Sequence, residues 1–514
     1  MAKAVASLVS SGASMEREAW FAQALQCETD GYPVTCRATV SAAGNVGFDN
    51  EDTVTDRCDA WAAEAESFVP AQRTGEAAND NARGIVTARA IFALALDTQP
   101  ARVDLWRSAA DMERAHGGAE DLEQLLKRAV RYCPQAEVLW LMAAKEKWVH
   151  QGDVPGARVI LEEAFTANPA SEAIVLAAVK LESETGQHSR ALKLLERARA
   201  TGFASSNGGE QMAMGTPRVW MKSAVLLRQL DRADEALKLA GNAVELFPEF
   251  HKLWLIKAQL EDVPVARQTL SRALKKCSRE PVLWTAAAQL ELQSQQRNAA
   301  RARAILERAR VYIPREPLLW LEAVRLEAGE NMDAARAVMA RALQECPRAG
   351  MLWAEAILLE PRAQRKAKSV DAMRSTDAHD PFVTVVVARL FWSERRVDKA
   401  RLWFERAARA DPDFGDAWAW WLRFELEQRS LARISSPVAD GALPATDGDA
   451  TAATADGAPP ADVHIARIET ACAQAAPCHG QYWPQIAKAP ANARLATKDV
   501  LYKVADFLGS TRQL

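Results

Sequence analysis

A tryptophan recurs at intervals of about 30 to 36 residues through most of this chain, and this regularity limits the possible folds more than any other feature. The ring lies in related segments, such as LWLMAAKEK and LWLEAVRLE. The recurring positions are Trp106, Trp140, Trp220, Trp254, Trp284, Trp320, Trp353 and Trp418. Val175 and Thr384 hold the same place without the ring. A fixed period of this size is typical of arrays in which each unit packs only against its neighbours.

A second motif lies between the tryptophan segments. It reads ARAILERARVYIP before one tryptophan and ARAVMARALQECP before the next. Apolar residues recur in it every three or four positions, as in an amphipathic helix, and the final proline ends that helix. The sequence therefore predicts an all-α fold, a right-handed α-solenoid of about ten stacked two-helix units, with the tryptophans filling the space between hairpins.

Two charged positions recur with this pattern, and we expect them to pair between the first helix of a unit (helix A) and the second (helix B). We take Glu327 and Arg336 as the example. The glutamates, seven residues after the tryptophan position, are Glu113, Glu182, Glu261, Glu291, Glu327, Glu360 and Glu425. The arginines, each after an alanine in helix B, are Arg89, Arg158, Arg267, Arg303, Arg336 and Arg401.

The array divides into four predicted parts. Residues 1–84 hold partial and divergent repeats, and residues 85–431 hold the regular array. Residues 432–462 include a stretch without Lys, Arg or aromatic residues, which cannot bury enough surface to offset its ordering entropy, so we predict a disordered insert. Residues 463–514 resume the helical pattern as a terminal repeat and capping helices.

Composition argues against several classes of function. The net charge of −3 disfavours a protein that grips long nucleic acid by bulk charge. The 8 cysteines show no paired CxxC spacing, so we expect no metal site, and Cys133, Cys277 and Cys346 read as buried thiols at helix ends. Cys472, Cys478 and His479 lie close in sequence without any other element of a catalytic motif. We expect no catalytic residues, no cofactor, no small-molecule substrate and no membrane span.

The densest basic cluster is the one candidate contact site. It comprises Arg362, Arg365, Lys366 and Lys368, next to an expected turn at Pro361. It could contact RNA phosphate or an acidic protein partner. The alternative is a solvated turn between helices, which is the usual fate of a short run of charges.

The combination of Trp, Glu and the Ala-Arg pair resembles the HAT repeat (half-a-tetratricopeptide) of RNA-processing scaffolds. The segments AEVLWLMAAKEKW, GDVPGARVILEEAF and PRAQRKAKSVDAM resemble the pre-mRNA-processing factor six family more specifically. This resemblance implies a non-enzymatic scaffold in the nucleus that bridges proteins of the U5 and U4/U6 snRNPs during assembly of the U4/U6·U5 tri-snRNP. It implies at most an indirect or minor contact with small nuclear RNA.

Met1 falls where that family would already be inside a repeat, so either the chain is a fragment that lacks an N-terminal region or its start is misassigned. Two other functions stay open. One is a HAT-repeat scaffold of mRNA 3′-end cleavage or ribosomal RNA processing. The other is an adaptor of the tetratricopeptide type, for which we find no carboxylate clamp.

Overall fold

The regular elements of the described residues are helices, joined mostly by short turns. The computed structural model describes residues 17–44, 53–68, 84–200, 215–293, 298–377, 379–435, 460–489, 492 and 495–511. The chain forms two compact units, Met1–Trp220 (unit 1) and Met221–Leu514 (unit 2). Each unit is described by itself below.

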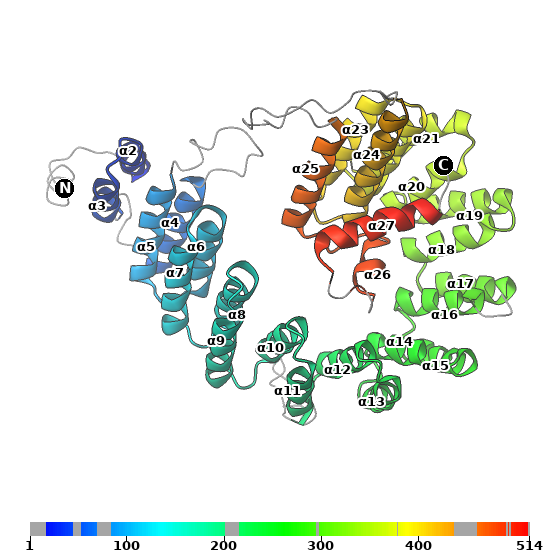
Figure 1. Ribbon diagram of the computed structural model, residues 1–514, viewed down its shortest axis with the longest axis horizontal. Helices are drawn as coiled ribbons and strands as arrows, with labels where there is room; N and C mark the ends of the chain where they lie inside the picture. Colours follow the sequence, from blue (N-terminus) through cyan, green and yellow to red (C-terminus); the bar gives the residue numbers. More distant parts are fainter. Residues whose placement is uncertain are drawn as a thin grey trace, which may run out of the picture. The chain divides into compact units, whose positions relative to one another are not determined.

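Unit 1 is a stack of helical hairpins (Figure 1). Its helices are α2 (Arg17–Thr29), α3 (Pro33–Ala43), α4 (Val54–Phe68), α5 (Ile85–Thr98), α6 (Val103–His116), α7 (Ala119–Tyr132), α8 (Glu137–Lys145), the π-helical turn η1 (Glu146–His150), α9 (Val154–Ala167), α10 (Glu172–Glu184) and α11 (His188–Ala200). Helices α6, α8 and α10 carry the tryptophan position and are A helices, whereas α5, α7, α9 and α11 are B helices.

Unit 2 continues the same alternation. Helix α12 (Pro217–Gln229) begins just before the boundary of this unit. It is followed by α13 (Ala233–Leu246), α14 (His251–Leu260), α15 (Val263–Lys276), α16 (Pro281–Gln293), α17 (Ala299–Tyr312), α18 (Pro317–Ala328), α19 (Met332–Glu345), α20 (Gly350–Leu359), α21 (Arg362–Ser375), α22 (Pro381–Ser393), α23 (Val397–Ala410), α24 (Gly415–Ser435), α25 (Pro460–Ala475), α26 (Trp483–Ala487) and α27 (Thr497–Thr511).

Several B helices stack through a narrow buried stripe that has small residues at both ends. In α17 the stripe is Ala302, Leu306 and Ala309, at the spacing that keeps side chains on one helix face. Helices α15 and α19 bury the same Ala–large–Ala pattern. Alanine lets the neighbouring backbones approach closely, and the central residue fills the gap between them. The predicted all-α repeat stack is confirmed.

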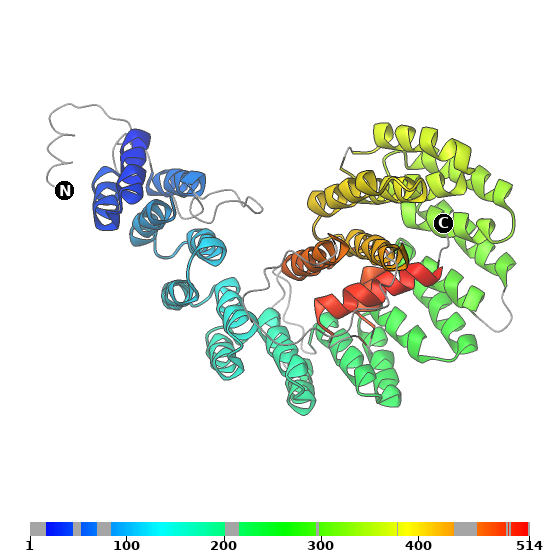
Figure 2. The same ribbon diagram turned by 45° about the horizontal axis from the view of Figure 1, so that its top comes forward.

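The end of unit 2 has its own core. Helices α24, α25 and α27 pack together around buried Phe424, Ile468 and Leu501. In Figures 1 and 2, α27 (red) lies on the inner side of the curve made by the other helices of unit 2. Of the predicted insert 432–462, the two ends are helical, in α24 and α25, and residues 436–459 lie outside the described part of the chain. The predicted boundaries of the four parts remain predictions.

Candidate functional site

The recurring tryptophans serve the joints between units through a hydrogen bond as well as through packing. In seven repeats the indole N–H donates to the backbone carbonyl six residues earlier, at 2.7 to 2.9 Å. The donors are Trp106, Trp140, Trp254, Trp284, Trp320, Trp353 and Trp418. The acceptor is a proline in every case except Ser278. Because proline ends helix B, its carbonyl is available to the next tryptophan, so the two sequence signals form one structural device.

Some of these carbonyls accept a second hydrogen bond from the following unit. The Pro134 carbonyl accepts from the Asn168 amide at 2.9 Å, and the Pro100 carbonyl accepts from the Cys133 thiol at 3.4 Å. The Cys277 thiol donates to the Pro248 carbonyl in the same way. Burial raises the pKa of both thiols, so they stay protonated at neutral pH and act as buried donors.

The charged positions form a ladder between successive units, and the expected pairing within a unit is wrong. Glu327 accepts two hydrogen bonds from Arg303 of the preceding helix B, and Arg336 instead bonds Asp333 and the Leu359 carbonyl. Five pairs 24 residues apart share the bidentate geometry, with Nε to carboxylate distances of 2.5 to 2.7 Å: Arg89–Glu113, Arg158–Glu182, Arg267–Glu291, Arg303–Glu327 and Arg401–Glu425.

Two glutamates of the motif lie outside this ladder because their A helices are shorter, and for Glu261 the arginine position of the preceding unit is Leu237. Helices α14 and α20 end at Leu260 and Leu359, so Glu261 and Glu360 fall just beyond the last turn with extended backbone. Glu261 accepts instead from the Thr269 hydroxyl, which lies in the same unit. At these joints the helix no longer carries the carboxylate to the arginine position of the preceding unit.

One joint carries the ladder with its charges exchanged. Glu123 of α7 and Lys147 of η1 occupy the positions of the arginine and the glutamate, and their side chains lie 2.7 Å apart. Hydrogen bonds from Lys127 and Lys147 hold the pKa of Glu123 down, at about 2. The sequence pattern of Ala-Arg and of Trp followed by Glu does not reveal this pair, because neither residue is of the type that the pattern requires. The two residues can be recognised only by their positions in the repeat.

The predicted basic cluster divides into two kinds of residue on α21. Arg365 donates to the Glu360 and Leu358 carbonyls and so caps the end of α20. Lys368 lies over the Trp353 ring, with its nitrogen 5.5 Å from the ring centre. Arg362 and Lys366 are exposed. Only these last two have side chains available for a partner, and the partner-contact role of the cluster remains a prediction.

The other candidates of the sequence serve packing or turn structure. Burial raises the pKa of Cys472 to about 12, which keeps this thiol protonated. Cys478 is exposed on a loop held by Asp413, and the His479 Nε2 lies 3.1 Å from the same carboxylate. Within the described residues, no group of three His, Cys, Asp or Glu could hold a metal ion, and no helix is long and apolar enough to cross a membrane.

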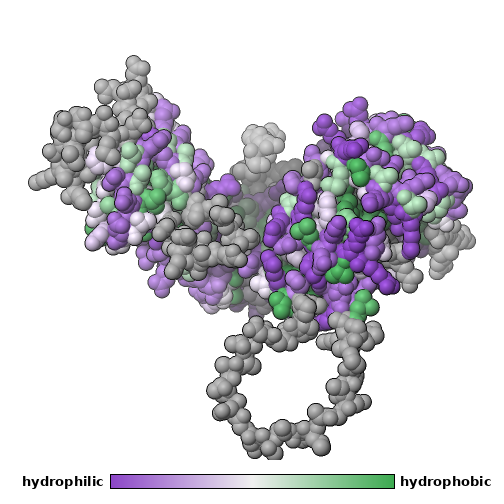
Figure 3. Space-filling model, turned by 90° about the horizontal axis from the view of Figure 1, so that it is seen from above, coloured by the Kyte–Doolittle hydropathy of each residue, from purple (hydrophilic) through white to green (hydrophobic). Residues whose placement is uncertain are grey.

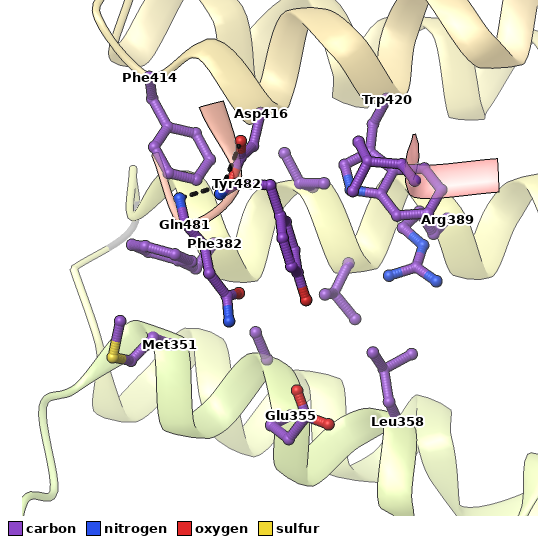
Figure 4. Close-up of a pocket in the computed structure, with 14 residues that line it drawn as sticks. Met351, Glu355, Leu358, Phe382, Arg389, Phe414, Asp416, Trp420, Gln481 and Tyr482 are labelled. Carbon is purple, nitrogen blue, oxygen red and sulfur yellow. Dashed lines mark hydrogen bonds between the residues drawn. The ribbon is translucent and has the colours of Figure 1, made fainter. Parts of the chain in front are cut away.

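A pocket on the inner side of unit 2 is the clearest feature that the sequence did not predict. Figure 4 shows Tyr482 in the middle of it, between α20 and α24, with its hydroxyl directed toward α20. Buried Asp416 holds this loop in place by accepting hydrogen bonds from the backbone amides of Gln481, Tyr482 and Trp483. Burial raises the pKa of Asp416, and the amide donors oppose that effect. The tyrosine hydroxyl accepts from Arg325 of α18 at 3.3 Å.

The pocket wall also uses a tryptophan that is extra to the repeat pattern. The Arg389 guanidinium lies over the Trp420 ring, 3.9 Å from its centre, and both side chains are buried. Trp392 and Trp421 are buried as well, so all three extra rings pack inside unit 2. Arg389 and Trp420 lie in successive A helices, at positions that the Trp, Glu and Arg motif does not include.

The face shown in Figure 3 is mainly hydrophilic, and its apolar residues appear as separate spots among charged side chains. Isolated apolar spots are ordinary on protein surfaces, whereas a broad apolar patch indicates a binding site.

Comparison with known proteins gives similarity along almost the whole chain. A family model described as tetratricopeptide repeat matches residues 149–207. Pre-mRNA-splicing factor prp1 of Schizosaccharomyces pombe is 36% identical over 512 residues, 99% of this chain and 50% of that protein. Pre-mRNA-processing factor 6 of Homo sapiens is 40% identical over 150 residues, 29% of this chain and 12% of that protein.

Among solved structures, a chain from the structure of Naa15/Naa10 bound to HypK-THB aligns with 99% of this chain and 73% of its own length. Its identity is 17% and the TM-score is 0.36. The chain thus spans half the length of its yeast relative and a smaller share of the human one.

Proposed function

The chain is a HAT-repeat homologue of the pre-mRNA-splicing factors prp1 and pre-mRNA-processing factor 6, and from this premise we propose that it is a non-enzymatic scaffold in pre-mRNA splicing. The resemblance predicted from the repeat motif is confirmed. In the proposed role the chain works in the nucleus and bridges proteins of the U5 and U4/U6 snRNPs during assembly of the U4/U6·U5 tri-snRNP. Contact with small nuclear RNA is indirect or minor.

The observation that carries this proposal is the length of the match with the yeast splicing factor, which covers 99% of the chain at 36% identity. A match confined to a few repeats would reflect the general repeat pattern alone. The structure adds a physical reason for a scaffold role. The motif residues are used at the joints between units, as in the Arg303–Glu327 pair and the Trp320–Pro314 bond, so other faces of the helices are left for partners.

The test is a pull-down of the tagged chain from nuclear extract, with the bound RNA and proteins identified. We expect U5, U4 and U6 RNA to be recovered together with their proteins, and lost when the extract is treated to dissociate the tri-snRNP. Recovery of factors for mRNA 3′-end cleavage or ribosomal RNA processing would overturn the assignment in favour of another HAT-repeat scaffold. Recovery of no such complex from an extract with intact particles would also overturn it.

The basic cluster supplies a second experiment within the same assay. The double variant R362E/K366E reverses the two exposed charges and leaves the capping residue Arg365 in place. If the cluster contacts an acidic partner or RNA, this variant should recover at least about tenfold less of it. The matched control is K275E/K276E, which reverses two exposed charges near the end of α15. Equal recovery by both variants would show that the cluster is a solvated face of α21.

A further inference from the structure

A groove runs between two successive B helices of unit 1. It has a volume of about 650 Å³, with α7 and α9 as its walls and α8 with η1 as its floor. On α7 the lining side chains include Leu126, Val130 and Arg131, which fall on one face of the helix. From Glu123 to Pro134, which also lines it, the groove extends about 16 Å, or roughly three helical turns.

The middle of the groove is mainly apolar, although Lys127 and the buried side chain of Glu146 also line it. Trp140 and Ala143 form the floor, and Val159 and Ile160 of α9 face α7 across it. Trp140 and Ala143 are buried, whereas Val159 is 53% exposed to solvent. A β-branched apolar side chain that stands open in a concave, apolar site resembles the anchor positions of helix-binding grooves.

One end of the groove is closed by polar contacts. Lys147 of η1 lies 2.7 Å from the Glu123 carboxylate, and the Gln151 amide donates to the same carboxylate. The π-helical turn at this point places Lys147 against α7, and such turns occur often at functional sites. The exchanged ion pair of the repeat ladder is therefore also the end wall of the groove.

The two walls carry opposite charges toward the other end. Arg131 of α7 and Glu163 of α9 both line the groove and both are exposed. A ligand that lies along the groove meets a cation on one flank and an anion on the other. Charge complementarity then selects a ligand with an acidic flank and a basic flank on either side of an apolar stripe.

We propose that this groove binds an amphipathic α-helix of a protein partner, with an apolar stripe of about three turns, acidic side chains toward α7 and basic side chains toward α9. The inference rests on the proposed scaffold function for the existence of protein partners, and it assigns to them one docking surface. An extended peptide is the competing occupant, and the experiment separates the two.

The probe is a designed, fluorescein-labelled helical peptide of about 14 residues, roughly four turns, with leucines at i, i+3, i+4 and i+7, glutamates on one flank and lysines on the other. Its binding to the full chain is measured by fluorescence anisotropy. We expect saturable binding that V159D weakens about tenfold or more, because the substitution places a charge inside the apolar groove. The control V311D changes a valine on α17 that is 82% exposed, and should leave binding unchanged.

Two further arms test the shape and charge of the ligand. A peptide with a central proline, which breaks the helix, should bind at least tenfold more weakly, and equal binding would overturn the helical occupant in favour of an extended one. The variant R131E makes both walls acidic, so we expect it to prefer a peptide with lysines on both flanks over the original probe. No change in preference would overturn the charge argument.

Two combinations of results separate the groove proposal from the scaffold proposal. If V159D recovers splicing particles normally and the peptide does not bind the wild type, the groove is overturned and the scaffold role stands. If the peptide binds as described and the pull-down recovers no splicing particle, the scaffold assignment is overturned and the groove stands.

Discussion

Arg325 of α18 donates a hydrogen bond to the hydroxyl of Tyr482, at 3.3 Å, across 157 residues of chain. The tyrosine belongs to a loop near the end of unit 2 that Asp416 holds by three backbone amides. The inner side of this unit is therefore lined in part by the chain's own later segment. A partner of unit 2 would meet that segment as part of the surface.

The Asp416 anchor can be tested by removing its carboxylate. In D416A the amides of residues 481–483 lose their acceptor, and we expect their hydrogen exchange to accelerate by at least about tenfold, in line with the loss of charge-assisted hydrogen bonds. Exchange followed by mass spectrometry measures this. The control Y482F removes only the Arg325 bond and should leave the amides protected. Unchanged exchange in D416A would contradict the anchoring role.

The Arg401–Glu425 pair is the joint best suited to a double-mutant cycle, because Glu425 is fully buried. We expect R401M to destabilise unit 2 by about 3 kcal/mol, since it leaves a buried carboxylate without its guanidinium. The coupling energy with E425Q should be about 1.5 to 3 kcal/mol in urea unfolding. The cycle R336M with E327Q is the control for pairing within a unit, and a coupling there as large as for Arg401–Glu425 would contradict the ladder.

Removing the indole N–H should lower the stability of the chain by an amount that depends on how deeply the tryptophan–carbonyl hydrogen bond is buried. W320F keeps an aromatic ring but leaves the Pro314 carbonyl without its donor, so we expect a loss of about 1 to 3 kcal/mol. W353F removes the equivalent bond from a more exposed ring and should cost less. The midpoints of urea unfolding compare the two. Equal costs would show that burial of the bond has no influence.

The exchanged pair predicts a dependence of stability on pH. The pKa of Glu123 is lowered to about 2 by Lys127 and Lys147, from 4.5 for a free glutamate. Its stabilising effect is therefore full above pH 4.5 and is lost as the pH falls through about 2. We expect E123Q to be less stable than the wild type at pH 6 and this difference to shrink between pH 4.5 and pH 2. Urea unfolding at several pH values measures it, with E120Q on the same helix as control. A difference that stays constant with pH would count against the pair.

The helical repeat could be predicted from sequence because its signals are local. Tryptophan, proline and the alanine stripe act over short stretches of chain, and their spacing alone places Trp320 six residues after Pro314. The pairing of the ladder could not be read in the same way. Glu327 lies 9 positions before Arg336 and 24 after Arg303, and both arginines carry the same motif, so only the packing of successive hairpins decides between them.

The inner pocket of unit 2 could not be predicted from the sequence. Asp416 and Tyr482 meet because the chain turns back after α25, and the residues between them include the stretch 436–459, where the repeat period is lost. Trp420 stands two residues after the tryptophan of its A helix, where α18 has Glu322, and Arg389 stands at the position where α18 has Arg325. Neither position belongs to the Trp, Glu and Arg motif, so the motif gives no reason to bring the two side chains together.

At the joints that carry a charge pair, the order of the two charges decides whether the array could gain or lose a whole unit there without repulsion. Deleting residues 268–303 would bring Arg267 to the place of Arg303, 24 positions before Glu327, and the joint would keep its attraction. Deleting residues 124–158 would bring Glu123 to the place of Arg158, facing Glu182, and two carboxylates would repel each other. The exchanged charges at the joint between α7 and α8 therefore fix the order of the units on either side of it. The joints around α15 to α18 carry the same order of charges, so a unit there could be duplicated or lost without bringing like charges together.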